Sequence, residues 1–600
     1  MQLSDFQASS NLVSLFLARA DELGDKPMLW AKRDGDWQPV TWAQAANQVC
    51  LIAENLLKLG LGSGDRVVLV SENRPEWCMA DLAIMAAGCI TVPTYTTNTT
   101  RDHIHILENS GAKAAIVSNA KLAKMLVPAI AQTDFCKTLV TIDPVKHDQE
   151  GNFDWYSWDS LFEGDADHAR EAVDTRAAGF GRGDLACIIY TSGTGGAPRG
   201  VRQHHGMLLH NIEGCAHIIV DDFGWADEVF LSFLPLSHAF EHTGGQLLPI
   251  GLGGQIYYAE GLEKLAGNIE EVKPTIMVVV PRLFELLRSR IMKQVEKQGK
   301  FATRLMDWAL AIGERKAAGR RKLLDFPKSA LLERTLRPKI RQRFGGRIKA
   351  LVSGGAPLNP EIGIFFDALG LTMLQGYGQT EAGPVISCNR PSAGIAMNTV
   401  GPPVHGAEVR IAQDGEILAR GEMVTHGYWQ NDAATAAAIV DGWLHTGDIG
   451  HIDEKGRIVI TDRKKDMIVN DKGDNVSPQK IESMLTVQPE ISQAMVAGDR
   501  RPYIVALIVP DAEWAVEWAQ AEDEKFDIDE LQGLPAFRNA VRAAIDRVND
   551  DLSVIEKVRQ FAFADEPFAI DNEEMTPSLK IRRHKLKERY GERLDALYKG

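Results

Sequence analysis

Short apolar runs alternate with helical segments over the first 180 residues of the chain. The runs DRVVLV (65–70) and CITVPTY (89–95) read as buried strands, and PEWCMADLAIMAAG (75–88) between them reads as a helix. The segment HILENSGAKAAIVS (105–118) repeats the order of helix and then strand. Strands that alternate with helices form parallel sheets with helices packed on them. The pattern therefore predicts an α/β fold.

Later segments predict further units around this core. At 600 residues the chain is too long for one hydrophobic core. Strand candidates recur within 227–280, and turn signals such as QDGE and EKGR at 400–460 predict a small antiparallel β-barrel. Past DRKKD, the segments VSPQKIESMLTVQP and YIVALIVPD predict a helix and a strand of an α+β unit. We expect an N-terminal domain over 1–462 that contains mixed or parallel sheets, a hinge at 463–466 and a C-terminal domain over 467–600.

The region 282–347 has a helical pattern and a strongly basic charge. It holds 19 Lys and Arg residues against 6 Asp and Glu residues, whereas the whole chain carries a formal net charge of −15. Tracts such as GERKAAGRRKLL place Leu among the cations. Two interpretations stay open for this insert. It forms a solvated helical face, or it forms a surface that meets anionic lipid headgroups.

Bulk features argue against several classes of protein. The net charge of −15 gives no whole-chain signal for nucleic-acid binding. The N-terminal residues have neither the basic nor the long apolar stretch of a leader, and no run of about 18 apolar residues predicts a membrane span. Seven cysteines without a CxxC pair predict reduced thiols in the core, without a disulfide frame or a zinc site. We therefore expect a cytoplasmic protein.

The stretch YTSGTGGAPRG (190–200) directly follows an apolar run and combines glycines, hydroxyls and one cation. Glycines let backbone N–H groups crowd an anion, and Ser and Thr add donors, so the loop predicts a phosphate site. It is not a Walker A sequence, because Gly200 is followed by Val201 and Arg202. A polar surface loop is the alternative interpretation.

Seven separated segments bring this loop into a larger pattern. In chain order they are YTSGTGGAPRG (190–200), LPLSHAFE (234–241), SGGAPL (353–358), GYGQTEAG (376–383), GWLHTGD (442–448), DRKKDMIVNDKGDNVSPQKIE (462–482) and TPSLKIRR (576–583). Together they resemble the core motifs of the adenylate-forming superfamily of acyl-CoA synthetases, adenylation domains and firefly-type luciferases. The resemblance covers essentially the whole chain. Within the superfamily, VVVPRLFE with its helical insert, DRKKD and TPSLK are most similar to long-chain fatty acid–CoA ligases.

The resemblance implies a ligase reaction in two halves. A fatty carboxylate attacks the α-phosphate of ATP, held with Mg²⁺, to give an acyl-adenylate and pyrophosphate. The thiolate of coenzyme A then attacks the acyl carbon and releases AMP. The implied partners are a fatty acid, ATP and coenzyme A, with no nucleic acid. Relatives are commonly dimers, and contact with anionic lipid would place the protein at the inner face of the membrane.

The resemblance also assigns the residues that bind the nucleotide. Tyr377 would lie on one face of adenine with Gly355 and Ala356 on the other, and Asp448 would accept from the ribose hydroxyls. The family's usual Lys and Thr are replaced by Arg199 and Gly195, which alters the pyrophosphate cradle. The implied ATP- and AMP-binding residues are Thr191, Ser192, Gly193, Thr194, Arg199, Gly355, Ala356, Gly376, Tyr377, Gly378, Gln379, Thr380, Asp448, Arg463 and Lys580.

Catalytic roles are implied for three residues. Lys580 would offset the repulsion between the attacking carboxylate and the α-phosphate, with Thr380 beside that phosphate. His238 would position the carboxylate, although a lone His is more often a core residue. Glu381 would be the Mg²⁺-associated carboxylate. The basic tail around Lys580 also fits a plain solvated face.

Further roles concern the second half-reaction and the acyl chain. Lys465 falls at the hinge position, about which the C-terminal domain of relatives rotates. Gly473 belongs to the segment that lines the pantetheine channel in relatives, although a glycine in a turn is the simpler account. Glycines at 244, 245, 251, 253 and 254 leave room for an acyl tunnel along strands.

Two rival functions stay open at this point. The same chemistry on an aryl or medium-chain acid, or with a carrier protein as acceptor, would use the same motifs. A catalytically degenerate member would retain the nucleotide or the acyl chain without turnover.

Overall fold

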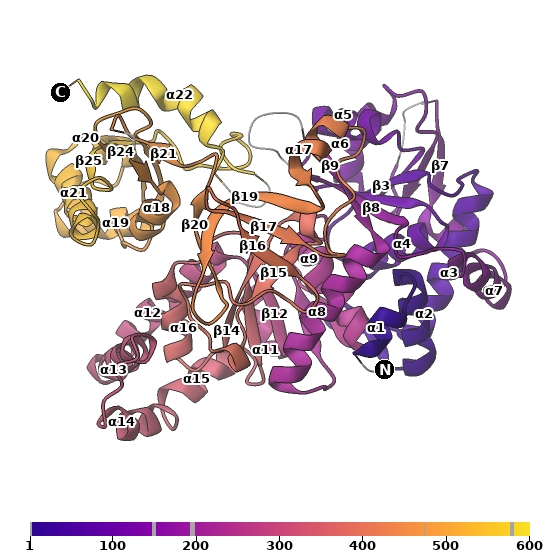
Figure 1. Ribbon diagram of the computed structural model, residues 1–600, viewed down its shortest axis with the longest axis horizontal. Helices are drawn as coiled ribbons and strands as arrows, with labels where there is room; N and C mark the ends of the chain where they lie inside the picture. The colour runs from indigo at the N-terminus through magenta and orange to yellow at the C-terminus, as the bar shows by residue number, and fades with distance from the viewer. Residues whose placement is uncertain (1–2, 147–151, 192–197, 473, 577–580, 600) are drawn as a thin grey trace.

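The computed structural model describes residues 3–146, 152–191, 198–472, 474–576 and 581–599. Two sheets covered by helices form the body of the protein, and an antiparallel sheet lies against them (Figure 1). The C-terminal residues, drawn in yellow, form a smaller unit beside that antiparallel sheet. The predicted α/β class is confirmed.

The first sheet has seven strands in the order β7-β6-β5-β3-β4-β8-β9. All neighbouring strands run parallel except β8 and β9, which are antiparallel. Its strands are β3 (Arg66–Val70), β4 (Ile90–Pro93), β5 (Ala114–Val117), β6 (Thr138–Thr141), β7 (Asp154–Ser157), β8 (Leu185–Thr191) and β9 (Arg199–His204). The strands predicted within 65–70, 89–95 and 105–118 are therefore confirmed.

The second sheet has eight strands in the order β15-β14-β13-β12-β10-β11-β1-β2. It is parallel in its interior and antiparallel at both ends, where β1 pairs with β2 and β14 pairs with β15. Its strands are β1 (Pro27–Arg33), β2 (Asp36–Thr41), β10 (Val229–Ser232), β11 (Gln255–Tyr258), β12 (Ile276–Val279), β13 (Ala350–Ser353), β14 (Met373–Gly378) and β15 (Val385–Cys388).

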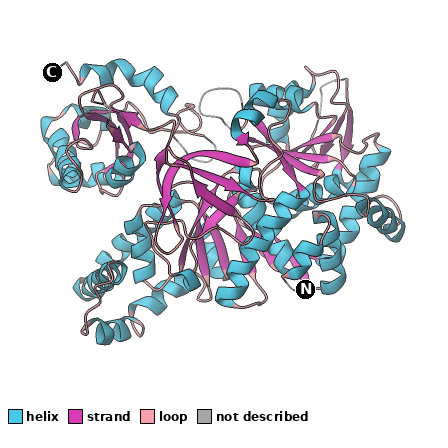
Figure 2. Ribbon diagram, in the orientation of Figure 1, coloured by secondary structure: helices cyan, strands magenta, loops and turns pink. Residues whose placement is uncertain are grey.

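Helices pack between and around the two sheets (Figure 2). Helix α4 (Pro75–Ala86), predicted at 75–88, has all twelve residues buried, as expected of a helix that is covered on every side. Together with α8 (His205–Phe223) it joins residues of both sheets in one hydrophobic core. The other helices of this part are α1 (Ser4–Ala8), α2 (Leu12–Leu23), α3 (Trp42–Lys58), α5 (Thr100–Ser110), α6 (Ala120–Ile130), α7 (Ala166–Ala177), α9 (Ala239–Glu241), α10 (Leu248–Leu252), α11 (Leu265–Val272) and α16 (Pro360–Ala368).

The basic stretch 282–347 is helical. It forms α12 (Pro281–Lys297), α13 (Lys300–Ala317), α14 (Asp325–Leu332) and α15 (Leu336–Arg343), which extend at the lower left of Figure 1. One face of these helices packs on α16 through side chains such as Met306, Ile312 and Phe366. The insert is therefore anchored by its apolar face and presents most of its cations outward, whereas Arg337 is buried against α16.

The antiparallel unit predicted at 400–460 is present as five strands in the order β16-β17-β19-β18, with β20 paired to β19. The strands are β16 (Glu408–Ile411), β17 (Glu416–Arg420), β18 (Ile439–Val440), β19 (Trp443–Ile452) and β20 (Ile458–Arg463), with α17 (Asp432–Ala438) before β18. This sheet adjoins β14 and so faces the carboxyl end of the eight-stranded sheet.

The C-terminal unit has its own core around a three-stranded sheet in the order β23-β24-β25. Helix α18 (Pro478–Leu485) and strand β24 (Ile504–Pro510) confirm the two predicted elements. The others are β21 (Ile468–Val469), β22 (Asn475–Val476), β23 (Ile491–Ala497), β25 (Val558–Phe563), α19 (Ala512–Ala521), α20 (Ile528–Gly533), α21 (Pro535–Asp550) and α22 (Arg583–Ala596). All seven cysteines of the protein are free thiols, and six of them are buried, as predicted.

Candidate active site

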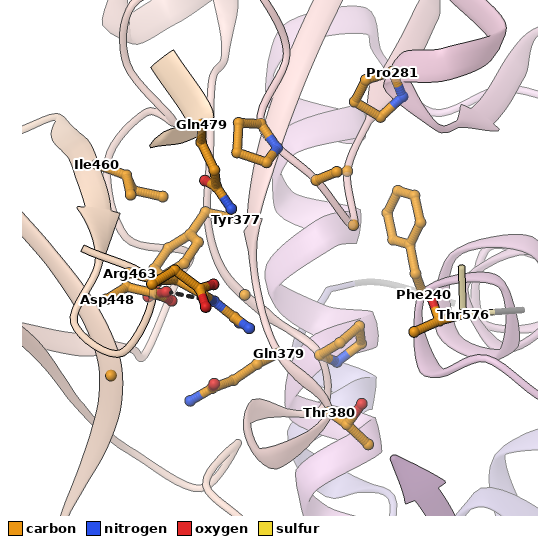
Figure 3. A pocket seen from close by; sticks show the side chains of 18 of the residues that line it. Phe240, Pro281, Tyr377, Gln379, Thr380, Asp448, Ile460, Arg463, Gln479 and Thr576 are labelled. Atoms are coloured by element: carbon orange, nitrogen blue, oxygen red, sulfur yellow. Dashed lines mark hydrogen bonds and ion pairs between the residues drawn. The ribbon is translucent and has the colours of Figure 1, made fainter. Parts of the chain in front are cut away.

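One continuous cavity runs between the end of β14, the antiparallel sheet and the C-terminal unit. Its volume is about 2630 Å³. A single drug-sized ligand occupies a pocket of roughly 300–1,000 Å³, so this cavity has room for several ligands or for one large ligand with a long arm. Figure 3 shows its centre, with Tyr377, Asp448 and Arg463 on one side and Phe240 and Pro281 on the other.

Asp448, Tyr377 and Arg463 form a hydrogen-bonded group in the cavity wall. The Tyr377 hydroxyl donates to Asp448 Oδ2 at 2.8 Å, and Arg463 Nε–H donates to Asp448 Oδ1 at 3.0 Å (Figure 3). A carboxylate has about four acceptor positions, so two remain for a ligand with vicinal hydroxyls. The side chain of Asp448 is only 6 % exposed, and the ion pair with Arg463 offsets the cost of burying its charge.

Local strand pairing explains how these residues meet. Asp448 of β19 lies directly opposite Arg463, the last residue of β20, in the antiparallel register. Burial raises the pKa of Tyr377, and the nearby Asp448 charge raises it further, so the phenol stays a hydrogen-bond donor. Burial alone would lower the pKa of Arg463, but the Asp448 carboxylate outweighs it and raises the pKa above its usual value.

Two glycines allow the chain to turn closely around this wall. Gly355 has a φ of +79°, a left-handed conformation that favours glycine. A Cβ on Gly378 would lie 1.8 Å from the carbonyl oxygen of Pro384, so no side chain fits there. Gly355 and the exposed Ala356 line the same cavity as Gly376, Tyr377 and Gln379. The structure thus brings together these residues of the SGGAPL and GYGQTE motifs.

Glu381 and Arg199 meet at a tyrosine that the sequence analysis did not identify. The Tyr428 hydroxyl donates to Glu381 Oε1 at 2.8 Å, and Arg199 Cζ lies 5.7 Å from the centre of the Tyr428 ring. Tyr428 reaches this place because it bridges Val201 of β9. No spacing signal could connect Tyr428 with Glu381, which lies 47 residues earlier.

Three further predicted residues, Thr380, His238 and Lys465, also line the cavity. Thr380 lines the cavity, and its backbone carbonyl accepts from Gln203 Nε2 at 3.0 Å. His238 also lines it, and its Nδ1 accepts from the Phe240 N–H at 3.2 Å at the start of α9. Lys465 is exposed, lines the cavity, and lies in the turn between β20 and β21.

Several predicted residues lie outside the described part of the chain. They are Ser192, Gly193, Thr194, Gly195, Gly473 and Lys580. The residues on either side of the first gap are placed: Thr191 lies opposite Arg199 in the pairing of β8 with β9, and both line the cavity. Thr576 and Ile581, on either side of the last gap, line it as well.

An apolar extension, which we call the apolar arm, continues the cavity away from Tyr377. It runs between α8 and the eight-stranded sheet, and its lining includes Ile218, Ile219, Val278, Val352, Leu374 and Cys388. Gly244, in a π-helical turn (His242–Leu247), also lines it opposite Val278. Gly245, Gly251, Gly253 and Gly254 are not in the lining of this cavity, so of these five glycines only Gly244 stays linked to an acyl tunnel. Residues 242–252 are helical, and a Cβ on Gly245 or Gly251 would meet Glu241 or Ile212.

Comparison with protein families identifies the chain. A family model described as AMP-binding enzyme matches residues 16–429, and one described as AMP-binding enzyme C-terminal domain matches residues 465–600. The chain belongs to the AMP-binding enzyme family. It is thus an adenylate-forming, acyl-activating enzyme, as the seven motifs implied.

Named relatives of this AMP-binding enzyme include fatty acid ligases. It is 34 % identical over 575 residues to the long-chain-fatty-acid–CoA ligase FadD15 of Mycobacterium tuberculosis. The match covers 94 % of this chain and 93 % of that protein. It is 29 % identical to the peroxisomal long chain acyl-CoA synthetase 7 of Arabidopsis thaliana, over 94 % of this chain and 82 % of that protein.

Solved structures of related enzymes share the fold. The A domain of the carboxylic acid reductase from Segniliparus rugosus, in complex with AMP and a co-purified carboxylic acid, matches with a TM-score of 0.74 at 20 % identity, over 98 % of this chain and 94 % of that chain. O-succinylbenzoate coenzyme A synthetase from Bacillus subtilis, in complex with ATP and a magnesium ion, matches with a TM-score of 0.66 at 20 % identity, over 96 % and 99 %. None of the described helices is long and apolar enough to cross a membrane.

Proposed function

We propose that this enzyme activates a fatty acid, of long chain, to its acyl-adenylate and then transfers the acyl group to coenzyme A. The apolar arm carries the proposal, because its residues line the same cavity as Tyr377, Asp448 and Arg463. Buried aliphatic side chains such as Ile218 and Leu374 line the arm. Each methylene that leaves water there contributes about 0.8 kcal/mol, so a long chain gains more than a short one.

In the first half-reaction, a carboxylate oxygen of the fatty acid attacks the α-phosphorus of ATP and pyrophosphate leaves. Asp448 and Arg463 would hold the ribose, with Tyr377 and Gly355 on the adenine. Arg199 and Thr191, with Ser192, Gly193 and Thr194, would hold the departing phosphates. Lys580 would lie between the two reacting anions, where a cation lowers the repulsion as charge develops. Mg²⁺, which Glu381 would help to hold, would neutralise part of the phosphate charge.

Glu381 fits the magnesium role that the resemblance implies. Its carboxylate lies at the cavity between Thr380 and the Tyr428 hydroxyl, and carboxylate oxygen is the donor that Mg²⁺ prefers. The neighbouring Arg199 supplies positive charge for the phosphates. His238 would orient the carboxylate of the acid, since it lies beside Phe240 on the side of the cavity from which the apolar arm begins.

In the second half-reaction, the thiolate of coenzyme A attacks the acyl carbon and AMP leaves. We propose that the C-terminal unit rotates about the turn that contains Lys465 and brings the segment of Gly473 to the pantetheine. The C-terminal unit contacts the N-terminal part lightly, for example where Asn359 Nδ2 donates to the carbonyl of Ser483 at 3.2 Å. Light contacts of this kind favour movement between the two parts.

The release of AMP with ATP and coenzyme A, measured across saturated acids of increasing length, tests this proposal. We expect catalytic efficiency to rise with chain length into the long-chain range. Benzoate and medium-chain acids serve as comparison substrates, and a preference for either would contradict the fatty-acid assignment. Binding of ATP without release of AMP on any acid would favour the degenerate binder.

The basic insert supports a proposal about how the acid is delivered. Leu323 and Leu324, just before α14, and Phe326, in its first turn, are 88, 71 and 64 % exposed. Three exposed cations, Arg320, Arg321 and Lys322, directly precede them. Exposed apolar side chains next to cations match the interface of an anionic bilayer, into which the apolar groups insert. We propose that residues 320–326 contact an anionic lipid bilayer, in which the fatty acid substrate is dissolved.

Sedimentation with liposomes tests the lipid contact. The protein should bind phosphatidylglycerol-containing vesicles at low salt and bind neutral phosphatidylcholine vesicles less. A Leu323→Ser, Leu324→Ser variant should lose most of the binding and keep its activity on soluble acid. Equal binding by this variant and the unchanged protein would contradict the proposal.

A further inference from the structure

Two histidines and one glutamate meet beside the middle of α8, and none of the three lines the large cavity. Glu213 and His217 lie one turn apart on the helix, and His405 comes from the segment before β16. Glu213 Oε1 lies 3.5 Å from His405 Nδ1 and 4.0 Å from His217 Nε2. One donor atom from each of the three residues lies within 4.8 Å of the others.

The buried carboxylate needs a positive partner at this place. Glu213 is only 5 % exposed, and among the described residues its ion-pair partners are these two histidines. A buried charge without a pairing cation is costly. A metal ion shared by the three side chains would supply that charge.

The surroundings of His217 match those of a metal-binding imidazole. Its Nε2 faces Glu213, and its other nitrogen, Nδ1, lies 3.7 Å from Asp221 Oδ2. Histidine ligands commonly present the second ring N–H to a carboxylate in this way, which fixes the ring and its tautomer. Gln7 Nε2 donates to Glu213 Oε1 at 2.7 Å and orients the carboxylate.

A small cavity of about 280 Å³ lies beside Glu213 and His405. It leaves room for the water molecules that complete the coordination of an ion held by three protein ligands. His210, one turn before Glu213, is 7 % exposed and also lines this cavity. Among the described residues neither of its ring nitrogens has a partner in hydrogen-bond geometry, and Nε2 lies against Gly406. The nearby cation, Arg182, is neutralised by its ion pair with Glu422.

We propose that Glu213, His217 and His405 bind a divalent transition-metal ion of the zinc class. Two imidazole nitrogens and one carboxylate oxygen suit Zn²⁺ and its neighbours better than Mg²⁺ or Ca²⁺. Bonds of about 2.0–2.2 Å in a tetrahedral site place donor atoms roughly 3.3 Å apart. The separations of 3.5 and 4.0 Å are close to this value, and the His217 and His405 rings, which stack with centroids 4.3 Å apart, would tilt toward the shared ion on binding.

The ion would join α8 to the segment before the antiparallel sheet. Asn211, on the same helix, supports the loop after the GYGQTE motif: its Nδ2 donates to the Ala382 carbonyl at 2.9 Å, and its Oδ1 accepts from the Val385 N–H at 2.6 Å. A metal bound at Glu213 and His405 thus stabilises the scaffold that carries Glu381. The site acts on stability and lies apart from the reacting groups.

Titration calorimetry on untagged, chelator-treated protein tests the site with ZnCl₂, and with MgCl₂ as the hard-cation comparison. We expect one Zn²⁺ per chain with micromolar or tighter affinity, and a melting temperature that rises with Zn²⁺. The His405→Gln variant, whose side chain is half exposed, should bind at least tenfold more weakly. His451→Gln, an exposed histidine in β19, is the matched control and should bind as the unchanged protein does.

Two outcomes would overturn the proposal. In the first, His405→Gln and His217→Gln bind Zn²⁺ with unchanged affinity and stoichiometry, so any binding is adventitious. In the second, the unchanged protein binds no Zn²⁺ above the level of the His217→Gln, His405→Gln double variant. The cluster is then a histidine pair that balances Glu213 with a proton.

Discussion

Arg463 donates to Asp448 directly across the last register pair of β19 and β20. This ion pair sits in the cavity wall at the point where the N-terminal part ends and the turn toward the C-terminal unit begins. It holds the carboxylate in one orientation and leaves part of its acceptor capacity free. The first prediction follows from this relationship.

Replacing Asp448 with Asn should weaken nucleotide binding by about 10- to 100-fold, or roughly 1.4–2.8 kcal/mol, because a charged acceptor is lost and Arg463 loses its partner. Calorimetric titration with AMP measures the change without relying on turnover. Tyr377→Phe is the matched control: it removes the hydrogen bond to Asp448 but keeps the ring, so its loss should be smaller. An Asp448→Asn variant that binds AMP normally would refute the ribose assignment.

A larger residue at position 244 should shift the substrate preference toward acids of shorter chain length. A Cβ at Gly244 would lie 3.0 Å from Val278 Cγ2 across the apolar arm. Gly244→Val should therefore reduce activity on long acids by at least tenfold and spare short ones, with Gly244→Ala intermediate. Catalytic efficiency against chain length measures this shift. A uniform loss on all acids would show that the change perturbs the fold and not the arm.

Lys580→Ala should abolish most adenylation, because it removes the cation that we propose lies between the two reacting anions, whereas Arg199 would remain on the departing phosphates. Acid-dependent exchange of pyrophosphate with ATP measures this half-reaction, and we expect a loss of at least 100-fold, about 2.7 kcal/mol. The neighbouring Lys585→Ala serves as the control for general loss of basic charge. Full exchange activity in Lys580→Ala would exclude the assigned role.

Lys465→Pro should separate the two half-reactions. Proline fixes φ near −65° and so restricts rotation in the turn. Pyrophosphate exchange should stay near normal while thioester formation falls strongly, as measured by acyl-CoA production from preformed adenylate. Lys465→Ala removes the charge but keeps the backbone free, so it should retain both activities. Equal loss of both halves in Lys465→Pro would contradict a hinge at this turn.

Glu241 gives the protein a pH-dependent stability. Burial raises the pKa of this carboxyl to about 8, so the folded protein holds a proton that the unfolded chain releases above about 4.5. The stabilisation is complete at low pH and is lost as the pH rises toward 8, by up to about 1.4 kcal/mol per unit. Glu241→Gln should remove this slope. The melting temperature of the variant, relative to that of the unchanged protein, should therefore rise as the pH increases from 5 to 8.

The exposed Glu454→Gln substitution is the matched control for that experiment. It should follow the unchanged protein at every pH. A constant gap between Glu241→Gln and the unchanged protein over pH 5–8 would mean that Glu241 is already ionised in the folded state.

The sequence predicted the strands near 65–95 and the helix at 75–88 because these elements are short, apolar and bounded by clear turn residues. It predicted that Tyr377, Asp448 and Arg463 belong to one site only through the family resemblance, since the three residues are far apart in the sequence. No local pattern places Tyr428 beside Glu381, because tertiary pairing with β9 brings it there. The sequence did not predict that residues 242–252 are helical, because glycines with Leu and Pro carry no period that separates a helix from a strand.

The anchoring of the turn at Lys464 also limits how the C-terminal unit can travel. Lys464 Nζ is bonded to Asp414 Oδ2 at 2.6 Å and to Glu416 Oε2 at 3.1 Å, and its N–H donates to the Gly447 carbonyl at 2.8 Å. The N-terminal side of the turn is therefore fastened to the antiparallel sheet. Movement about residues 465–467 would then be a rotation of the C-terminal unit about a point fixed on the antiparallel sheet, and not a translation along it. In such a rotation Arg463 would stay on Asp448, so a nucleotide bound there, as we propose, would keep this contact while the C-terminal side of the cavity changed.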